Sequence, residues 1–312
     1  MTSASTHILE PSAQDVPSLP TARTIAWDGL SLTVPSHWEP ARLGLGFLML
    51  EDASGPRLSL RWQRIKGVFD PAKVLKRLAR RKFLKPSRRP DGAVSAMLSS
   101  LSPEHQALPC ADTAGGGADG LLFTIPGSDL AVLGAPHARP DEKASPWVEA
   151  AISLSASDPA LFSLFDVCGQ APPGFRLAVF SVQLGHFHFQ FRKRASTLDY
   201  YRFAPAEVIL RAKSLDGWAS EVFAQALNKP RVFAPGYFDS APACRFEDSP
   251  RPGFTGAARA QVCRLFPSFR FARAMAWRPG GSKILAVIAR HRGELSPDAF
   301  EEVCRRYAVQ AL

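Results

Sequence analysis

This sequence contains an internal repeat, which limits the folds that the chain can adopt. FDPAKVLKRL (69–78) matches FAPAEVILRA (203–212) at five positions, 134 residues apart. GFLMLEDASGPRLSLRW (46–62) lies over GHFHFQFRKRASTLDYY (185–201) at a spacing of 139, and DVC (166–168) lies over EVC (302–304) at 136. Three matches at nearly one spacing indicate a tandem duplication. We predict repeats at 24–169 and 170–312, behind a Ser-, Thr- and Pro-rich lead-in of residues 1–23 that is expected to be disordered and resembles no secretory leader.

Both repeats follow one plan of secondary structure. Two hairpins come first, then a helix that opens at Asp70–Pro71 in one copy and at Pro205 in the other, since Asp caps helices and Pro suits the first turn. The later strands are expected at 147–155 and 283–291, and the terminal helices at 158–168 and 296–309. Runs of strands with two helices per copy predict an α+β fold, as two tandem antiparallel-sheet domains covered by helices.

The order of hairpin, hairpin, helix, strands and helix, with the early turn VPSHW (34–38), resembles the PsbP-like fold, duplicated in tandem. The second copy has Pro172 and Phe175 where the first has Pro35 and Trp38, so it departs from the Pro-x-x-Trp pattern. The resemblance implies an antiparallel sheet sandwiched by helices and no catalytic motif. Members of that fold mostly bind other proteins, so a binding module is the implied function.

The segment GHFHFQF (185–191) raises the question of a metal site, because an i, i+2 histidine pair can chelate zinc or iron. Alternate side chains of a strand share a face, so the three phenylalanines are predicted to face the core and His186 and His188 the opposite side. The first copy places Phe47 and Met49 at the histidine positions. No third ligand accompanies the pair, so we predict no bound metal and keep a metal-dependent enzyme centred on these histidines as an alternative.

Other chemistry is not predicted from the sequence. The GGG at 115–117 lacks the GK[ST] of a phosphate-binding loop, and no GxSxG is present. We therefore predict no catalytic residue and no cofactor. The five cysteines show no CxxC spacing, which favours a reducing, cytoplasmic location over a disulfide framework. No run of about 18 apolar residues is present, so no membrane span is predicted.

The net charge of +10 is concentrated in one stretch. Residues 64–92 contain eleven Lys or Arg against two Asp, and the rest of the chain is nearly neutral. An apolar stripe with basic residues on the opposite side predicts an amphipathic helix with a basic face. The second copy replaces Lys73, Lys76 and Arg80 with Glu207, Leu210 and Ser214, so the fold does not require this face. The predicted partner-binding residues are Lys73, Lys76, Arg77, Arg80, Arg81, Lys82, Lys85, Arg88 and Arg89.

These observations favour a non-enzymatic protein-interaction or adaptor module that binds an acidic protein surface through the basic helix. Clustered basic residues also suit phosphate contacts, so non-specific nucleic-acid binding with the same residues is the first alternative. A solvated face that serves only solubility is the simplest reading of a charge run. The sequence does not indicate an oligomeric state.

Overall fold

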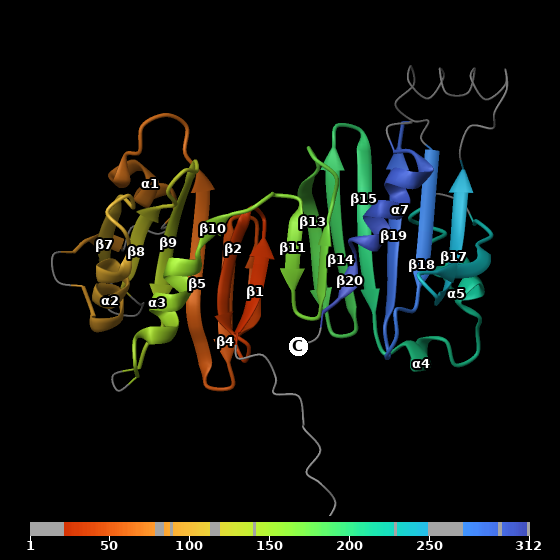
Figure 1. Cartoon of the computed structure of the whole chain (residues 1–312), viewed down its shortest axis with the longest axis horizontal. Coiled ribbons are helices and arrows are strands. Elements are labelled where there is room, and N and C mark those ends of the chain that lie inside the picture. Colours follow the sequence, from red (N-terminus) through yellow and green to blue (C-terminus); the bar gives the residue numbers. More distant parts are fainter. Residues whose placement is uncertain are drawn as a thin grey trace, which may run out of the picture.

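The computed structural model describes residues 22–78, 84–87, 90–112, 119–139, 142–227, 230–248, 271–292 and 295–310. Of these described residues, 48% lie in strands and 19% in helices. Every strand pairing within them is antiparallel, and the strands form three sheets. Figure 1 shows two large sheets at opposite ends of the molecule, with strands of the third sheet between them.

The first large sheet has the strand order β3-β4-β5-β9-β8-β7-β6. Its strands are β3 (Glu39–Gly44), β4 (Phe47–Asp52), β5 (Gly55–Arg64), β6 (Leu84–Pro86), β7 (Ala107–Asp112), β8 (Gly120–Thr124) and β9 (Leu130–Pro136). Three helices accompany it: α1 (Pro71–Leu78), α2 (Gly92–Ser100) and α3 (Ser145–Ser153).

The second large sheet has the order β13-β14-β15-β19-β18-β17-β16, which is the topology of the first sheet. Its strands are β13 (Arg176–Gln183), β14 (His186–Lys193), β15 (Ser196–Phe203), β16 (Ala234–Phe238), β17 (Ala241–Asp248), β18 (Phe271–Trp277) and β19 (Ile284–His291). Its described helices are α4 (Ala206–Ile209), α5 (Leu215–Val222) and α7 (Pro297–Arg305).

The third sheet is assembled from both halves of the chain, in the order β10-β2-β1-β11-β12-β20. It contains β1 (Ala22–Trp27), β2 (Leu30–Pro35), β10 (Ser155–Ala156), β11 (Leu161–Leu164), β12 (Val167–Gln170) and β20 (Ala308–Val309). At its centre β1 pairs with β11, with Ala26 opposite Ser163, and the Ser163 hydroxyl donates to the carbonyl oxygen of Thr24 at 2.9 Å. We call it the shared sheet.

The prediction of an α+β fold made of two tandem antiparallel-sheet domains covered by helices is wrong. The fold is mostly antiparallel sheet, in three sheets rather than two helix-covered ones. The physical reason lies in the leading hairpins, β1–β2 and β11–β12. Each leaves its own seven-stranded sheet and pairs with the other hairpin, so their backbone hydrogen bonds are satisfied between the halves.

Two predicted elements are also wrong. Residues 147–155, expected as a strand, lie mainly in α3, where the buried Trp147, Ala150 and Ala151 recur at helical spacing. Residues 158–168, expected as a terminal helix, contain β11 and the first half of β12. The match of DVC with EVC therefore aligns a strand with α7. By strand order, β11–β12 holds the place in the second half that β1–β2 holds in the first, and the predicted boundary at 169/170 falls inside β12.

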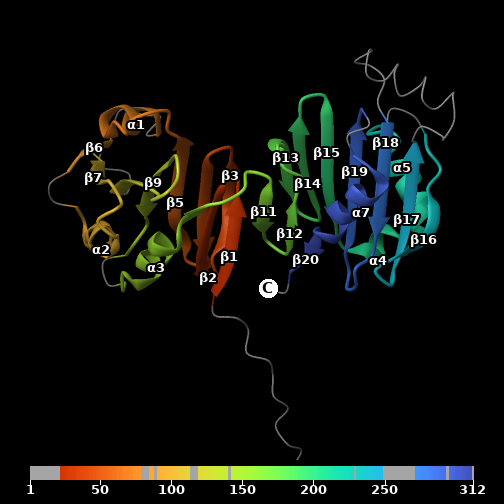
Figure 2. The same cartoon turned by 45° about the horizontal axis from the view of Figure 1, so that its top comes forward.

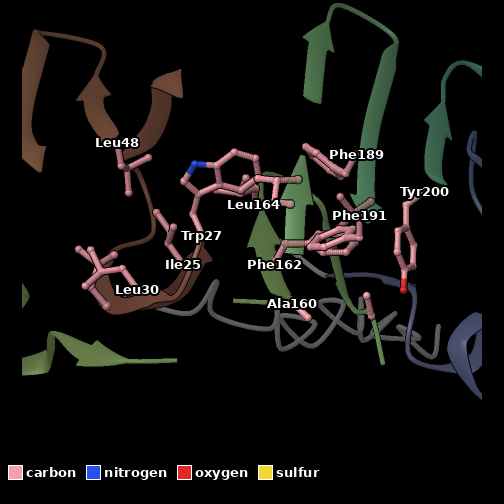
Figure 3. Close-up of a cluster of buried hydrophobic side chains, with 14 of the residues drawn as sticks. Ile25, Trp27, Leu30, Leu48, Ala160, Phe162, Leu164, Phe189, Phe191 and Tyr200 are labelled. Atoms are coloured by element: carbon pink, nitrogen blue, oxygen red, sulfur yellow. The ribbon is translucent and has the colours of Figure 1, made fainter. Parts of the chain in front are cut away.

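One hydrophobic core joins the three sheets. Figure 3 shows Trp27 and Phe162 of the shared sheet between Leu48 of one large sheet and Phe189 of the other. The Trp27 ring lies 5.7 Å from the Phe189 ring, and the Phe162 ring lies 5.1 Å from it. Smaller apolar clusters lie under α1 and around α5. The two halves therefore share buried aromatic surface and are packed as one body.

The hairpins β3–β4 and β13–β14 turn through the same local structure. Gly46 and Gly185 have φ of 64° and 80°, and a Cβ on either would lie 2.6 Å from a carbonyl oxygen, of Trp62 or Ala204 respectively. Only glycine fits such a close approach at positive φ. The turns place Leu45 and Leu184 at corresponding exposed tips, 51% and 106% exposed.

Candidate protein-interaction surface

The helix α1 begins where the sequence predicts. The Asp70 carboxylate accepts a hydrogen bond from the Lys73 backbone N–H at 3.1 Å, and Pro71 is the first helical residue, so the predicted cap is confirmed. Val74, Leu75 and Leu78 are buried. They pack in one cluster with buried residues of β7, β8 and β9: Cys110, Leu122, Ala131 and Leu133. The apolar side of α1 is therefore committed to the outer face of the first large sheet.

The opposite side of α1 is basic and open to solvent. Lys73, Lys76 and Arg77 are exposed, and we call them the α1 basic face. Lys85, on β6, is exposed as well. None of these four side chains forms an ion pair with another described residue. The other predicted partner-binding residues, which are Arg80, Arg81, Lys82, Arg88 and Arg89, lie outside the described residues.

The helix α7 provides an internal comparison, because it is also short and amphipathic but is electrically compensated. Arg305 pairs with Glu301 at 2.5 Å and Arg306 with Glu302 at 2.8 Å, both at i, i+4 spacing. Exposed pairs of this kind contribute little to stability, yet they cancel the charge of the surface. The α1 basic face has no such acidic neighbours on its own helix.

The corresponding segment of the second half is neither basic nor a two-turn helix. The helix α4 spans only Ala206–Ile209, and the chain then turns into α5. Glu207 lies 3.5 Å from Arg278, Leu210 packs against the α5 cluster, and the Ser214 hydroxyl caps α5. Each of these three residues, which stand at the positions of Lys73, Lys76 and Arg80 in the first copy, thus makes a structural contact of its own.

The segment GHFHFQF forms β14, and its predicted two faces are confirmed. Phe187, Phe189 and Phe191 are buried in the shared core, whereas the histidines face the other side of the sheet. On that side, the buried Asp199 carboxylate forms hydrogen bonds with several side chains. His188 Nε2 lies 2.9 Å from Asp199 Oδ1, Gln190 Nε2 donates to the same oxygen at 2.7 Å, and Arg290 donates to Oδ2 at 3.2 Å.

The histidine rings stack on aromatic side chains of β15. The His188 ring is nearly parallel to that of Tyr201 at 4.4 Å, and the His186 ring lies 4.7 Å from that of Phe203. Burial, with a smaller effect of His188, lowers the pKa of His186. Within the described part of the chain, no three His, Cys, Asp or Glu residues are placed to hold a metal ion. The arrangement is that of a hydrogen-bonded, stacked polar cluster on a sheet face.

Sequence reasoning missed a cleft between the two halves. It has a volume of about 560 Å³ and lies between β3 of the first large sheet and β13 of the second, with the turn of β11–β12 at its base. At that turn the buried Asp166 accepts from Arg202 at 2.5 Å and pairs with Lys283 at 2.8 Å. No local sequence pattern could place these three residues together, because Asp166 lies in the β11–β12 turn, Arg202 on β15 and Lys283 just before β19.

No protein-family model matches the chain, and no curated protein sequence matches it significantly. Among the described residues, no helix is both long and apolar enough to cross a membrane.

Proposed function

We propose that this chain is a non-enzymatic protein-interaction module that binds an acidic protein surface through the α1 basic face. The observation that carries the proposal is the difference between the two sides of α1. Its apolar side is buried, while Lys73, Lys76 and Arg77 are exposed without an ion pair to any described residue. Uncompensated cations at i, i+3 and i+4 form a compact charge that an acidic partner would neutralise.

The surroundings of the α1 basic face favour a protein over a nucleic acid. Val68, in the loop before α1, is 94% exposed. A nearby apolar side chain adds contact area with a protein surface, whereas it contributes little to the binding of phosphate groups. Non-specific nucleic-acid binding by the same residues is the outcome that the experiment below has to separate.

The described thiols support a role without catalysis in a reducing compartment. Cys110, Cys168, Cys244 and Cys304 are free. Burial raises the pKa of Cys110 to about 11 and that of Cys244 to about 12, so these thiols stay protonated and unreactive at neutral pH. Unpaired buried cysteines suit the cytoplasm, which is the location we propose.

The test reverses the charge of the α1 basic face in the triple variant Lys73→Glu, Lys76→Glu, Arg77→Glu. The matched control reverses Arg192, Lys193 and Arg194, three exposed basic residues of the β14–β15 hairpin. Both variants change the net charge by the same amount. We expect the parent chain to capture a protein partner in a complex that survives nuclease treatment. The α1 variant should lose this partner, and the control should retain it.

Added salt should weaken the captured complex steeply, because exposed charges are screened over about 8–10 Å at physiological ionic strength. A complex that disappears with nuclease would replace the protein partner by nucleic acid. Equal capture by the parent and by the α1 variant would leave the basic face as a solubility feature only.

A further inference from the structure

The cleft between the two halves is bounded by the outer edges of two strands. One wall comes from β3, through Pro40 and Leu43, and the other from β13, through Phe180 and Val182. Beside the cleft, Trp27 bridges the same two strands, since its indole Nε1 donates to the Gly44 carbonyl oxygen at 2.9 Å and its ring lies 5.1 Å from Phe180. Figure 2 shows β3 and β13 on the inner sides of the two large sheets, near the strands of the shared sheet.

Most strand edges among the described residues are protected against pairing with another chain. The shared sheet ends in β10 and β20, which have two residues each. The edges of the large sheets at β6 and β16 contain Pro86 and Pro235, and β3 contains Pro40 next to a bulge. Short strands, prolines and bulges are the devices by which proteins prevent edge-to-edge pairing.

The edge at β13 lacks that protection over its second half. Its bulge lies between Leu177 and Val179, so residues 179–183 form a regular stretch with neither a proline nor a charged residue. Gln183 and His186 flank a two-residue turn and exchange backbone hydrogen bonds, so alternation directs the N–H and C=O groups of Phe180 and Val182 outward. These groups form a template for one more strand.

We propose that the β13 edge binds an extended peptide segment of a protein partner as an added strand lying in this cleft. The lining selects a segment with apolar side chains at alternate positions, because Leu43, Phe180 and Val182 surround the space. A volume of about 560 Å³ is in the range of ligand clefts, and five strand residues span roughly 17 Å.

The charges of the cleft specify one end of the segment. Asp166 pairs with both Arg202 and Lys283, whereas Glu39 forms no ion pair with a described residue and is attracted only by the charge of Arg23. Glu39 lies directly opposite Glu51 on β4, and the nearby Arg23 donates to the Trp38 carbonyl oxygen instead. Two carboxylates facing each other across a strand pair repel, and a cation relieves that repulsion. The bound segment therefore carries a Lys or Arg beside Glu39.

A thin segment fits this edge better than a second copy of the chain. The free edge of β13 opens toward β3 of the same molecule, and Trp27 bridges the two strands beside it. A whole seven-stranded sheet approaching edge to edge would meet β3, whereas a single strand would not.

The experiment selects binders from a displayed library of random twelve-residue peptides with the full chain as target, and then measures each selected peptide in synthetic form. We compare Val182→Pro with Val182→Ala, because both remove the valine side chain and only proline also removes the outward N–H. The expected affinity loss is about tenfold or more for proline relative to alanine. Methylation of the peptide's backbone nitrogens should also abolish binding, and Glu39→Lys should reject peptides with a basic end.

Selected peptides with alternating apolar residues should slow hydrogen exchange at the Phe180 and Val182 amides. Triple charge reversal of the α1 basic face should leave this binding unchanged, which separates this site from the one proposed above. A library that yields no binder, or binders indifferent to Val182→Pro, would overturn the proposal. A concentration-dependent dimer that Val182→Pro abolishes would likewise overturn it, in favour of a second copy at the edge.

Discussion

Asp166 shows how a single buried carboxylate stabilises the junction of the two halves. It lies in the turn between β11 and β12 and joins Arg202 of β15 to Lys283 before β19. Burial acts to raise the pKa of Asp166, but the hydrogen bonds from Lys283 and Arg202 outweigh it, so the pKa lies below its ordinary value. The carboxylate is held ionised by its partners, and the shared sheet is tied to the second large sheet.

We expect Asp166→Asn to lower the free energy of unfolding at pH 7 by about 1–3 kcal/mol, since it leaves two cations without their partner. A group with a depressed folded-state pKa stabilises above its unfolded pKa, near 3.9, and that contribution is lost as the pH falls through the folded value. The difference between parent and variant should therefore shrink below about pH 4. Urea denaturation at several pH values measures it.

The matched control is Asp129→Asn, because Asp129 forms an exposed pair with Arg64 at 2.6 Å. Exposed pairs contribute about 0–1 kcal/mol, so this variant should unfold almost like the parent at every pH. An Asp166 variant as stable as the parent at pH 7 would show that the cluster contributes nothing to the junction.

At the scale of elements, α1 illustrates why amphipathic helices are the most predictable part of such a chain. The spacing of Val74, Leu75 and Leu78 requires one buried side, and the structure buries all three. The failure at 147–155 has the opposite origin. That segment is itself mostly apolar, without a single clear apolar side. A short apolar run of this kind does not distinguish a helix from a strand.

Substitutions on the two sides of α1 should separate packing from charge. Leu75→Ala is expected to lower the free energy of unfolding by about 2–3 kcal/mol, at the low end for buried leucines because its cluster is small. Lys76→Ala is expected to stay within about 0.5 kcal/mol of the parent, since its side chain is exposed and unpaired among the described residues. Equal losses in urea denaturation would mean that the basic side also supports the fold.

At the scale of the whole molecule, the shared sheet makes the two halves interdependent. Its central pairing, β1 with β11, takes one strand from each half, and the core around Trp27 and Phe162 contacts both large sheets. Two independent domains would each bury their apolar faces within their own core. Here the separation of the two halves would expose core side chains such as Trp27 and Phe162.

We therefore expect the chain to unfold as one cooperative unit. Leu60 of β5 is fully buried, so Leu60→Ala should cost about 2–5 kcal/mol. Native-state hydrogen exchange should show the same loss of protection at β18 and β19, in the opposite large sheet, as at β5 itself. Unchanged protection at β18 and β19 would instead identify two domains that unfold separately.

The features that could be predicted from the sequence are those that depend on residues close to one another along the chain. The alternation of GHFHFQF specified a strand with a buried phenylalanine face, the spacing within 71–78 specified the buried side of α1, and Asp70–Pro71 specified where that helix begins. The same local patterns could not reveal which hairpin pairs with which, because a free strand edge has no preferred partner until the apolar surfaces around it are buried.

Three features could not be predicted without the tertiary structure: the pairing of β1 with β11, the predominance of strands over helices among the described residues, and the cleft between β3 and β13. The reason is that these contacts join residues more than a hundred positions apart. Their free energy comes from burying Trp27, Phe162 and Phe189 together, a gain that exists only when both halves have folded against each other.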